Sequence, residues 1–299
     1  MLQRERQSID AELSPPFTIV CPREQSAPFV FCSPHSGRVY PSALLAAAKL
    51  DAHALRKSED CRVDELFAAV ADLGAPLIAA RFARAYLDVN REPYELDPAL
   101  FREPLPSYTN TQSARVMGGL GTIPRIVADT EEIYREPLTL AVALERIERL
   151  YKPFHEALRT LIDATRRRFG LAILIDCHSM PSCSTNPSAA ARPDCVVGDR
   201  FGASCEAKVT RFVRDAIAAQ GYQVHLNRPY AGGYITEHYG RPQRGVHALQ
   251  LEINRALYLN ESSLQTTAGF LTLKNNLARL TERLFAELPQ SLEPRAAAE

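Results

Sequence analysis

Short apolar runs that suit β-strands alternate along this chain with longer stretches that have the spacing of amphipathic helices. One clear strand-like run covers residues 28–32, and another covers residues 171–175. Alternation of strands and helices is typical of layered α/β folds, in which helices cover a central sheet. We therefore expect an α/β protein whose strands provide a rigid frame for a functional site.

The rest of the pattern predicts further elements. Strands are expected at 76–80, 86–89, 222–226 and 248–253, and helices at 41–50, 64–73, 137–169, 205–219 and 263–288. Residues 92–125 contain several prolines and glycines and predict a long irregular excursion near the site, because long loops in compact domains are usually functional. Residues 181–194 are expected to form a surface loop.

The composition excludes several classes of protein. The 299 residues include 35 basic and 35 acidic side chains, so no basic excess indicates nucleic acid or an anionic membrane as a partner. No stretch approaches the ~18 consecutive apolar residues of a membrane span, and the polar start is not a signal peptide. The seven cysteines form no Cys-x-x-Cys pair. This pattern predicts a protein of the reduced cytoplasm.

A histidine lies just beyond each of the two leading apolar runs, His35 after the first and His178 after the second. Ligands of open α/β sheets usually bind at the carboxyl ends of strands, and two imidazoles held there suit a borderline metal such as zinc. One such histidine alone is more often a hydrogen-bonded residue of a polar crevice. The matching pair favours a metal site.

A catalytic zinc site needs a third protein ligand, commonly a carboxylate, and an open position for water. The segment 58–65 offers Glu59, Asp60, Asp64 and Glu65. Asp60 stands at the entrance of a predicted helix, whereas Asp64 and Glu65 lie further in, where acids often serve only the helix dipole. The residues alone favour Asp60 only slightly.

Two more acids lie in predicted strands. Asp176 would point to the same side as His178, where it either orients an imidazole or is simply a buried acid. Glu252 lies inside an apolar strand pattern, and a buried carboxylate is costly unless it is paired or functional. Desolvation raises the pKa of such a group, which suits a general base. The alternative is an ion pair of Glu252 with Arg244 or Arg255.

Other segments offer substrate contacts. Asn90 and Arg91 follow the predicted strand 86–89, and an arginine fork binds carboxylates bidentately, although a structural salt bridge is an equal alternative. The glycine-bearing loop 229–236 would let backbone amides approach a substrate. Residues 118–121 lack the Lys-Ser/Thr of a P-loop, so nucleotide binding is discounted.

Two other kinds of protein compete with a metal enzyme. A cysteine hydrolase would use Cys177 or Cys32 with a nearby histidine. A binding protein would hold a metal or an acidic ligand without turnover.

Five short motifs occur in order between residues 28 and 260. They are Ser33-Pro34-His35-Ser36-Gly37 with Tyr40-Pro41; Ser58-Glu59-Asp60; Arg84-Ala85-Tyr86-Leu87-Asp88-Val89-Asn90-Arg91; Asp176-Cys177-His178-Ser179; and Gly232-Gly233-Tyr234-Ile235-Thr236 with Gly245-Val246-His247-Ala248-Leu249-Gln250-Leu251-Glu252. With these motifs the chain resembles the N-formylglutamate amidohydrolase family, which is related to zinc carboxypeptidases and aspartoacylases. The resemblance implies a three-layer αβα, phosphorylase/hydrolase-like fold with a mixed central sheet. We expect a single catalytic domain over 1–299, with loose ends at 1–14 and 290–299.

The resemblance also implies a metal site. Carboxypeptidases have a glutamate ligand three residues after the first zinc histidine, but this chain has Arg38 there, so the acid must come from elsewhere. The aspartate that recurs in this family falls on Asp60. Together with His35 and His178, Asp60 would hold one divalent ion, taken to be zinc.

The remaining roles follow from the same resemblance. Asn90 and Arg91 correspond to a carboxylate-binding pair, with Gly233 in the loop that approaches the substrate. Glu252 corresponds to the general base. Arg84 falls inside a matching motif without a role that the resemblance implies, and as a nearby arginine it is the first choice to stabilise the oxyanion.

The implied substrate is a small N-acyl acidic amino acid. N-formyl-L-glutamate, cleaved to formate and L-glutamate in histidine degradation, is the leading candidate. The alternative is a deacylase or amidase acting on another N-acyl amino acid or a small peptide. Glutamate has two carboxylates, so a second basic anchor is expected, with Arg244 or Arg255 as candidates. His238 and His247 receive no role.

Overall fold

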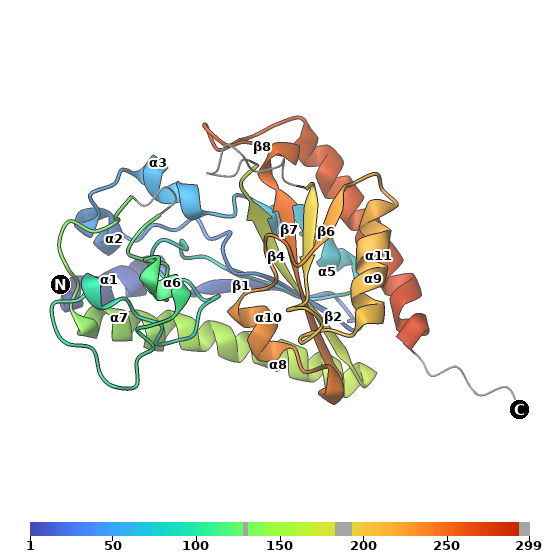
Figure 1. Ribbon diagram of the computed structural model, residues 1–299, viewed down its shortest axis with the longest axis horizontal. Coiled ribbons are helices and arrows are strands. Elements are labelled where there is room, and N and C mark those ends of the chain that lie inside the picture. Colours follow the sequence, from blue (N-terminus) through green and yellow to red (C-terminus); the bar gives the residue numbers. More distant parts are fainter. Residues whose placement is uncertain (128–130, 183–192, 293–299) are drawn as a thin grey trace, which may run out of the picture.

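The computed structural model describes residues 1–127, 131–182 and 193–292, and it has the expected layered α/β architecture (Figure 1). One mixed sheet has the strand order β1-β3-β2-β4-β7-β5-β6. Its strands are β1 Phe17–Val20, β2 Phe29–Ser33, β3 Leu77–Ala80, β4 Ala172–Met180, β5 Cys195–Gly198, β6 Val224–Leu226 and β7 Val246–Asn254; β8 Leu259–Asn260 and β9 Gln265–Thr266 form a separate pair. The neighbours β3, β2, β4 and β7 are parallel, whereas β1 and β5 run antiparallel to β3 and β7.

Helices pack on both faces of this sheet, which confirms the three-layer prediction (Figure 1). The α-helices are α1 Leu2–Glu12, α2 Ser42–Ala47, α3 Ala52–Leu55, α4 Val63–Leu66, α5 Ala69–Leu73, α6 Ala114–Met117, α7 Leu140–Arg146, α8 Lys152–Phe169, α9 Ala207–Ala218, α10 Tyr234–Tyr239 and α11 Gly269–Leu292. Phe29 and Phe31 of β2 face the core formed with α4, α5, α9 and α11, whereas Val30 and Cys32 face the core formed with α1, α7 and α8. Because both faces are buried, the parallel strands occur in the sequence as continuous apolar runs.

The predicted helix at 137–169 is a helical rod with an internal π-helical turn. α7 continues through η4, Ile147–Tyr151, into α8. Pro153 stands in the first turn of α8 and lacks an N–H group, so the preceding residues cannot keep the regular hydrogen-bond ladder. The predicted helix at 64–73 is also divided, into α4 and α5.

The strand predicted at 86–89 is wrong. The segment is irregular and does not join the neighbouring part of the sheet, where β3 and β4 occupy both edges of β2 and β1 occupies the outer edge of β3. Its carbonyl groups are bound by side chains instead: those of Tyr86 and Val89 accept hydrogen bonds from Arg146 and His155.

The expectation of a loose start at residues 1–14 is also wrong. Residues 2–12 form α1, which packs against α7 and buries Ile9 and Leu13 in the core. Glu5 of this helix is buried in an ion pair with Arg146. A pattern of mostly polar residues concealed this packing, because few side chains of α1 face inward. At the other end, helix α11 runs to Leu292, and residues 293–299 lie outside the described residues.

Two further differences concern the neighbourhood of the site. β4 is longer than predicted and reaches Met180, so His178 lies inside the strand rather than beyond it. Part of the glycine loop at 229–236 is the start of α10. Residues 183–192 of the predicted loop at 181–194 lie outside the described residues. No helix in the described part of the chain has the length and apolar character needed to cross a membrane.

Candidate active site and metal centre

A cavity of about 710 Å³ lies where β2, β4 and β7 end. Segments far apart in the sequence contribute its walls. The lining includes His35, Asp60, Arg84, Asp88, Asn90, Arg91, Arg115, His178, Gly233, Gln250, Glu252 and Arg255. Open α/β sheets typically bind ligands at this edge.

The three predicted metal ligands meet in this cavity. One nitrogen or oxygen from each of His35, Asp60 and His178 lies within 4.8 Å of the others. Oδ2 of Asp60 is 2.8 Å from Nδ1 of His178 and 3.5 Å from Nδ1 of His35. All three side chains are buried and therefore held in place. Two imidazole nitrogens and one carboxylate oxygen are a donor set that suits zinc.

Asp64 and Glu65, the competing acids, do not join this group. Both pair with Arg38, whose Nη2 lies 2.7 Å from Oδ2 of Asp64 and whose Nη1 contacts Oε1 of Glu65. Asp60 instead sits in the turn before α4, where its N–H donates to the carbonyl of His35 at 3.0 Å. The geometry therefore favours Asp60 as the third ligand.

A carboxylate contacts the outer nitrogen of each histidine. Nε2 of His35 is 2.7 Å from Oδ1 of Asp88, and Nε2 of His178 is 3.0 Å from Oδ2 of Asp176. Such pairs fix an imidazole with its other nitrogen directed at a metal. Among the described residues, Nδ1 of His35 is buried without a hydrogen-bond partner, although it lies beside Asp60. This orphaned nitrogen fits a metal ligand.

The electrostatics of the site also fit a cation. Burial alone would raise the pKa of Asp60, but the hydrogen bond from His178 and the neighbouring ring of His35 hold it well below its usual range. The second oxygen of Asp60 accepts from Arg255 and Ser179, each at 3.2 Å. Burial lowers the pKa of His178, yet Asp176 and Asp60 outweigh it and raise that pKa well above its usual value. A bound cation would therefore displace a proton, so its affinity should rise with pH.

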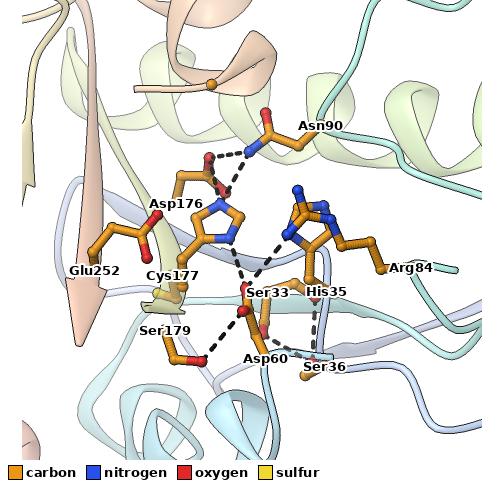
Figure 2. A network of polar contacts seen from close by, with 12 residues as sticks. Ser33, His35, Ser36, Asp60, Arg84, Asn90, Asp176, Cys177, Ser179 and Glu252 are labelled. Atoms are coloured by element: carbon orange, nitrogen blue, oxygen red, sulfur yellow. Dashed lines mark hydrogen bonds and ion pairs between the residues drawn. The ribbon is translucent and has the colours of Figure 1, made fainter. Parts of the chain in front are cut away.

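Glu252 approaches this group from β7, where it is paired in register with His178. Figure 2 shows its carboxylate directed into the cluster. Burial raises the pKa of Glu252 to about 7, against the effect of the neighbouring positive groups. Gln250, on the same face of the strand, donates from Nε2 to Oε1 of Glu252 at 2.7 Å. Oε2 is thus left to accept a proton.

Asp88 also holds two arginines at the site. Arg84 donates from Nε to Oδ2 of Asp88 at 3.0 Å, and the other oxygen of that carboxylate contacts His35. Nη2 of Arg91 is 3.6 Å from Oδ2 of Asp88. Arg91 also donates from Nε to the carbonyl of Leu120 and from Nη1 to its neighbour's carbonyl, each at 2.8 Å, so part of its fork is used inside the protein.

Asn90 is held on both ends of its amide. Nδ2 lies 3.2 Å from Oδ2 of Asp176 and 3.0 Å from Nε2 of His178, and Oδ1 accepts from the N–H of Ile235 at 2.7 Å. A Cβ at Gly233 would lie 2.5 Å from this amide, so only glycine allows the approach. These contacts make Asn90 a support for the Asp176–His178 pair as well as part of the cavity wall.

Three residues considered in the sequence lie elsewhere. Arg244 is exposed in the turn before β7, so the structure does not bring this predicted anchor to the site. His247 lies near the start of β7, and His238 stacks on Tyr234 of α10. Arg255, the other candidate anchor, does line the cavity but holds Asp60.

The cysteine alternative is not supported. Cys32 and Cys177 are fully buried, and burial raises the pKa of both thiols well above the usual value. A nucleophilic cysteine needs the opposite shift, because the thiolate is the reactive form.

Sequence reasoning assigned no role to Gln250, Asp88 or Arg115. The signal for Gln250 was present, since it stands two residues before Glu252 in a strand and shares its face. Asp88 gave no local signal, because its partner His35 is 53 residues away. Arg115 lies in the irregular excursion, whose course the sequence does not fix.

Comparisons with known proteins agree with this geometry. The sequence profile of the N-formylglutamate amidohydrolase family matches residues 27–259. N-formylglutamate deformylases of Pseudomonas putida and Pseudomonas aeruginosa are 29% and 31% identical to the chain, over 89% of this chain and 92% of each relative. The crystal structure of an N-formylglutamate amidohydrolase from Ralstonia eutropha JMP134 matches with a TM-score of 0.87 and 35% identity, over 93% of this chain and 99% of that one. The chain belongs to the N-formylglutamate amidohydrolase family.

Proposed function

We propose that this protein hydrolyses N-formyl-L-glutamate to formate and L-glutamate, a reaction of histidine degradation. The observation that carries the proposal is one cavity in which two histidines and an aspartate meet beside Glu252, a buried carboxylate with a pKa of about 7. The names of the curated relatives support the choice of substrate.

His35, Asp60 and His178 would hold one divalent ion, and their donor atoms favour zinc. When bound, such an ion would polarise the formyl carbonyl and lower the pKa of a water toward ~7. Asp88 and Asp176 keep the two imidazoles in the orientation that this binding requires.

Glu252 acts as the general base and then as the general acid. Its Oε2 takes a proton from the attacking water and later delivers it to the nitrogen of the leaving amine. The bond between the formyl carbon and this nitrogen breaks, which gives formate and free L-glutamate. Gln250 holds Oε1 and so keeps the carboxylate in position throughout.

Arginines orient the substrate and stabilise charge. Arg84 is fixed through Nε to Asp88, and its remaining N–H groups stabilise the negative charge that develops on the formyl oxygen. Arg91 contributes Nη2 to the α-carboxylate, while Asn90 and Gly233 shape the wall beside it.

The competing candidate is a deacylase that acts on a different N-acyl amino acid or a small peptide with the same residues. The observation that favours this alternative is the cavity volume of about 710 Å³, which has room for an acyl group larger than formyl. A panel that compares N-formyl, N-acetyl and dipeptide substrates separates the two.

The direct test is release of formate from N-formyl-L-glutamate. Protein loaded with zinc, then treated with a chelator and reloaded, is expected to be active, inactive and active again. Activity that persists after chelation would refute the metal assignment. Glu252→Gln should bind the metal normally but lose about 10²- to 10⁴-fold in kcat, the usual contribution of a general base.

A further inference from the structure

The proposed substrate has two carboxylates, and the structure offers a specific partner for the second. In the described part of the chain, the cavity is lined by six cationic side chains, those of Lys57, Arg84, Arg91, Arg115, Arg200 and Arg255.

Five of these cations already lie beside carboxylates of the protein. The pairs are Lys57–Glu131, Arg84–Asp88, Arg91–Asp88, Arg200–Glu237 and Arg255–Asp60, at separations between 2.7 and 3.6 Å. Their charges are partly neutralised before any ligand binds.

Arg115 differs from them. It is half-buried on α6, and its side chain has no hydrogen bond or ion pair with any residue within 1–127, 131–182 or 193–292. Its N–H groups are therefore available to an anion that enters the cavity, and a bound carboxylate would form a charge-assisted contact with them. Its place in the cavity wall makes an anionic substrate group the natural partner.

Hydrogen bonds tie Arg115 to the rest of the site. Ser113 caps α6 by accepting from the N–H of Val116 at 3.0 Å. The carbonyl of Arg115 accepts from the N–H of Leu120, whose own carbonyl accepts from Nε of Arg91, each at 2.8 Å. The loop that presents Arg115 is therefore fixed relative to Arg91, the proposed contact of the α-carboxylate.

The two arginines are also within electrostatic range of each other. Burial, partly offset by Asp88, lowers the pKa of Arg91 to about 10, and repulsion from Arg84 and Arg115 adds to the shift. A small dianion bound between Arg91 and Arg115 would relieve this repulsion.

We propose that Arg115 binds the side-chain carboxylate of the N-formyl amino acid and so sets the preference for a glutamate-like substrate. The inference rests on the proposed function and deepens it. N-formyl-L-glutamine has the same length but a neutral side chain, so the ratio of kcat/KM for the two substrates reports this contact.

The test compares both substrates in the wild type and in Arg115→Gln. The variant should lose about 10- to 100-fold in kcat/KM for N-formyl-L-glutamate, mainly through KM, as expected for one charge-assisted contact. Its kcat/KM for N-formyl-L-glutamine should stay within about threefold of the wild type, and Arg115→Lys should recover part of the loss. Arg102→Gln is the matched control, because Arg102 is exposed on the same excursion and pairs with Glu136 outside the cavity; both substrates should be unaffected.

An equal loss on both substrates, or no loss, would overturn the role of Arg115. Calorimetric binding of L-glutamate and L-glutamine to the same proteins separates this outcome from failure of the proposed function. If the wild type released no formate, the proposed function would fail, but a preference for glutamate that disappears in Arg115→Gln would still support the contact. Equal binding of L-glutamate and L-glutamine by the wild type would overturn the role of Arg115.

Discussion

Glu252 should control the pH dependence of this enzyme. Burial raises the pKa of its carboxyl to about 7, and a general base works only when deprotonated. The kcat/KM should therefore rise with pH through the acid range and level off above about 7. A cation bound beside Glu252 would lower the pKa of its carboxyl and so move this rise to lower pH. A pH–rate profile of the metal-loaded protein measures it. The residual activity of Glu252→Gln should lack the limb, and a wild-type limb that begins only above pH 8 would assign the base to another group.

Asp88 should control metal affinity. It accepts from His35 and anchors Arg84, so Asp88→Asn would leave the imidazole poorly oriented and less basic. We expect metal affinity to fall about 10- to 100-fold, measured by competition with a chromophoric chelator. Asp97→Asn is the control, since Asp97 is a buried acid that pairs with Arg125, and neither residue lines the cavity or contacts a proposed ligand. Equal affinities for both variants would reject the role of Asp88.

At the residue scale the sequence indicated the three clustered side chains better than the residues that support them. His35 and His178 stand out because each closely follows an apolar run, a local pattern. Resemblance to a family is what mainly favours Asp60 over its acidic neighbours, since nothing in the local sequence shows that Asp64 and Glu65 pair with Arg38. The residues that position them, such as Asp88, depend on contacts between distant segments, and no local sequence pattern indicates them.

At the scale of elements, the helical rod of α7, η4 and α8 holds the irregular segment 86–91. Arg146 donates to the carbonyl of Tyr86 at 3.0 Å, Tyr151 to that of Arg91 at 2.7 Å and His155 to that of Val89 at 2.8 Å. Burial lowers the pKa of His155 to about 4, so its ring is neutral at pH 7. A π-helical turn is common at functional sites, and here it carries Tyr151.

Tyr151→Phe tests this support. The change removes the hydroxyl that holds the backbone of Arg91, so KM for N-formyl-L-glutamate should rise several-fold, with a stability loss of about 1 kcal/mol. Tyr222→Phe is the matched control, because the hydroxyl of Tyr222 accepts a hydrogen bond from Asn276 away from the site. It should cost similar stability in a thermal melt but leave KM unchanged. A rise in KM for both variants would show a general effect rather than positioning.

The error at 86–89 has a physical reason. The run Tyr86-Leu87-Asp88-Val89 is apolar enough for a strand, and Tyr86, Leu87 and Val89 are indeed buried. A strand also needs a partner strand, and the sequence does not show that β3 and β4 occupy both edges of β2 while β1 occupies the outer edge of β3. Burial was predictable from composition, whereas hydrogen-bond partners were not.

At the scale of the whole molecule, the site joins parts that pack in different layers. Asp60 precedes α4 in one core, and Asp88 is supported by the rod of α7 and α8 in the other. The N-terminal helix α1 completes this second layer, since Glu5 contacts both Arg146 and Tyr86. The layered fold was predictable from alternating patterns; the strand order and the packing of α1 were not, because both depend on long-range contacts.

Metal removal should therefore destabilise the whole fold. An ion held by His35, Asp60 and His178 links three separate segments, and it stabilises the native state in proportion to its occupancy. At a free concentration of about 100 times Kd this amounts to about 2.7 kcal/mol, or roughly 5 °C in Tm for a chain of this size. Differential scanning calorimetry with and without chelator measures the shift. His178→Ala lacks one ligand, so its Tm, whatever its absolute value, should be much less sensitive to chelator. A wild-type Tm that does not respond to chelator, in protein shown to contain metal beforehand, would mean that the ion is not held by these three segments.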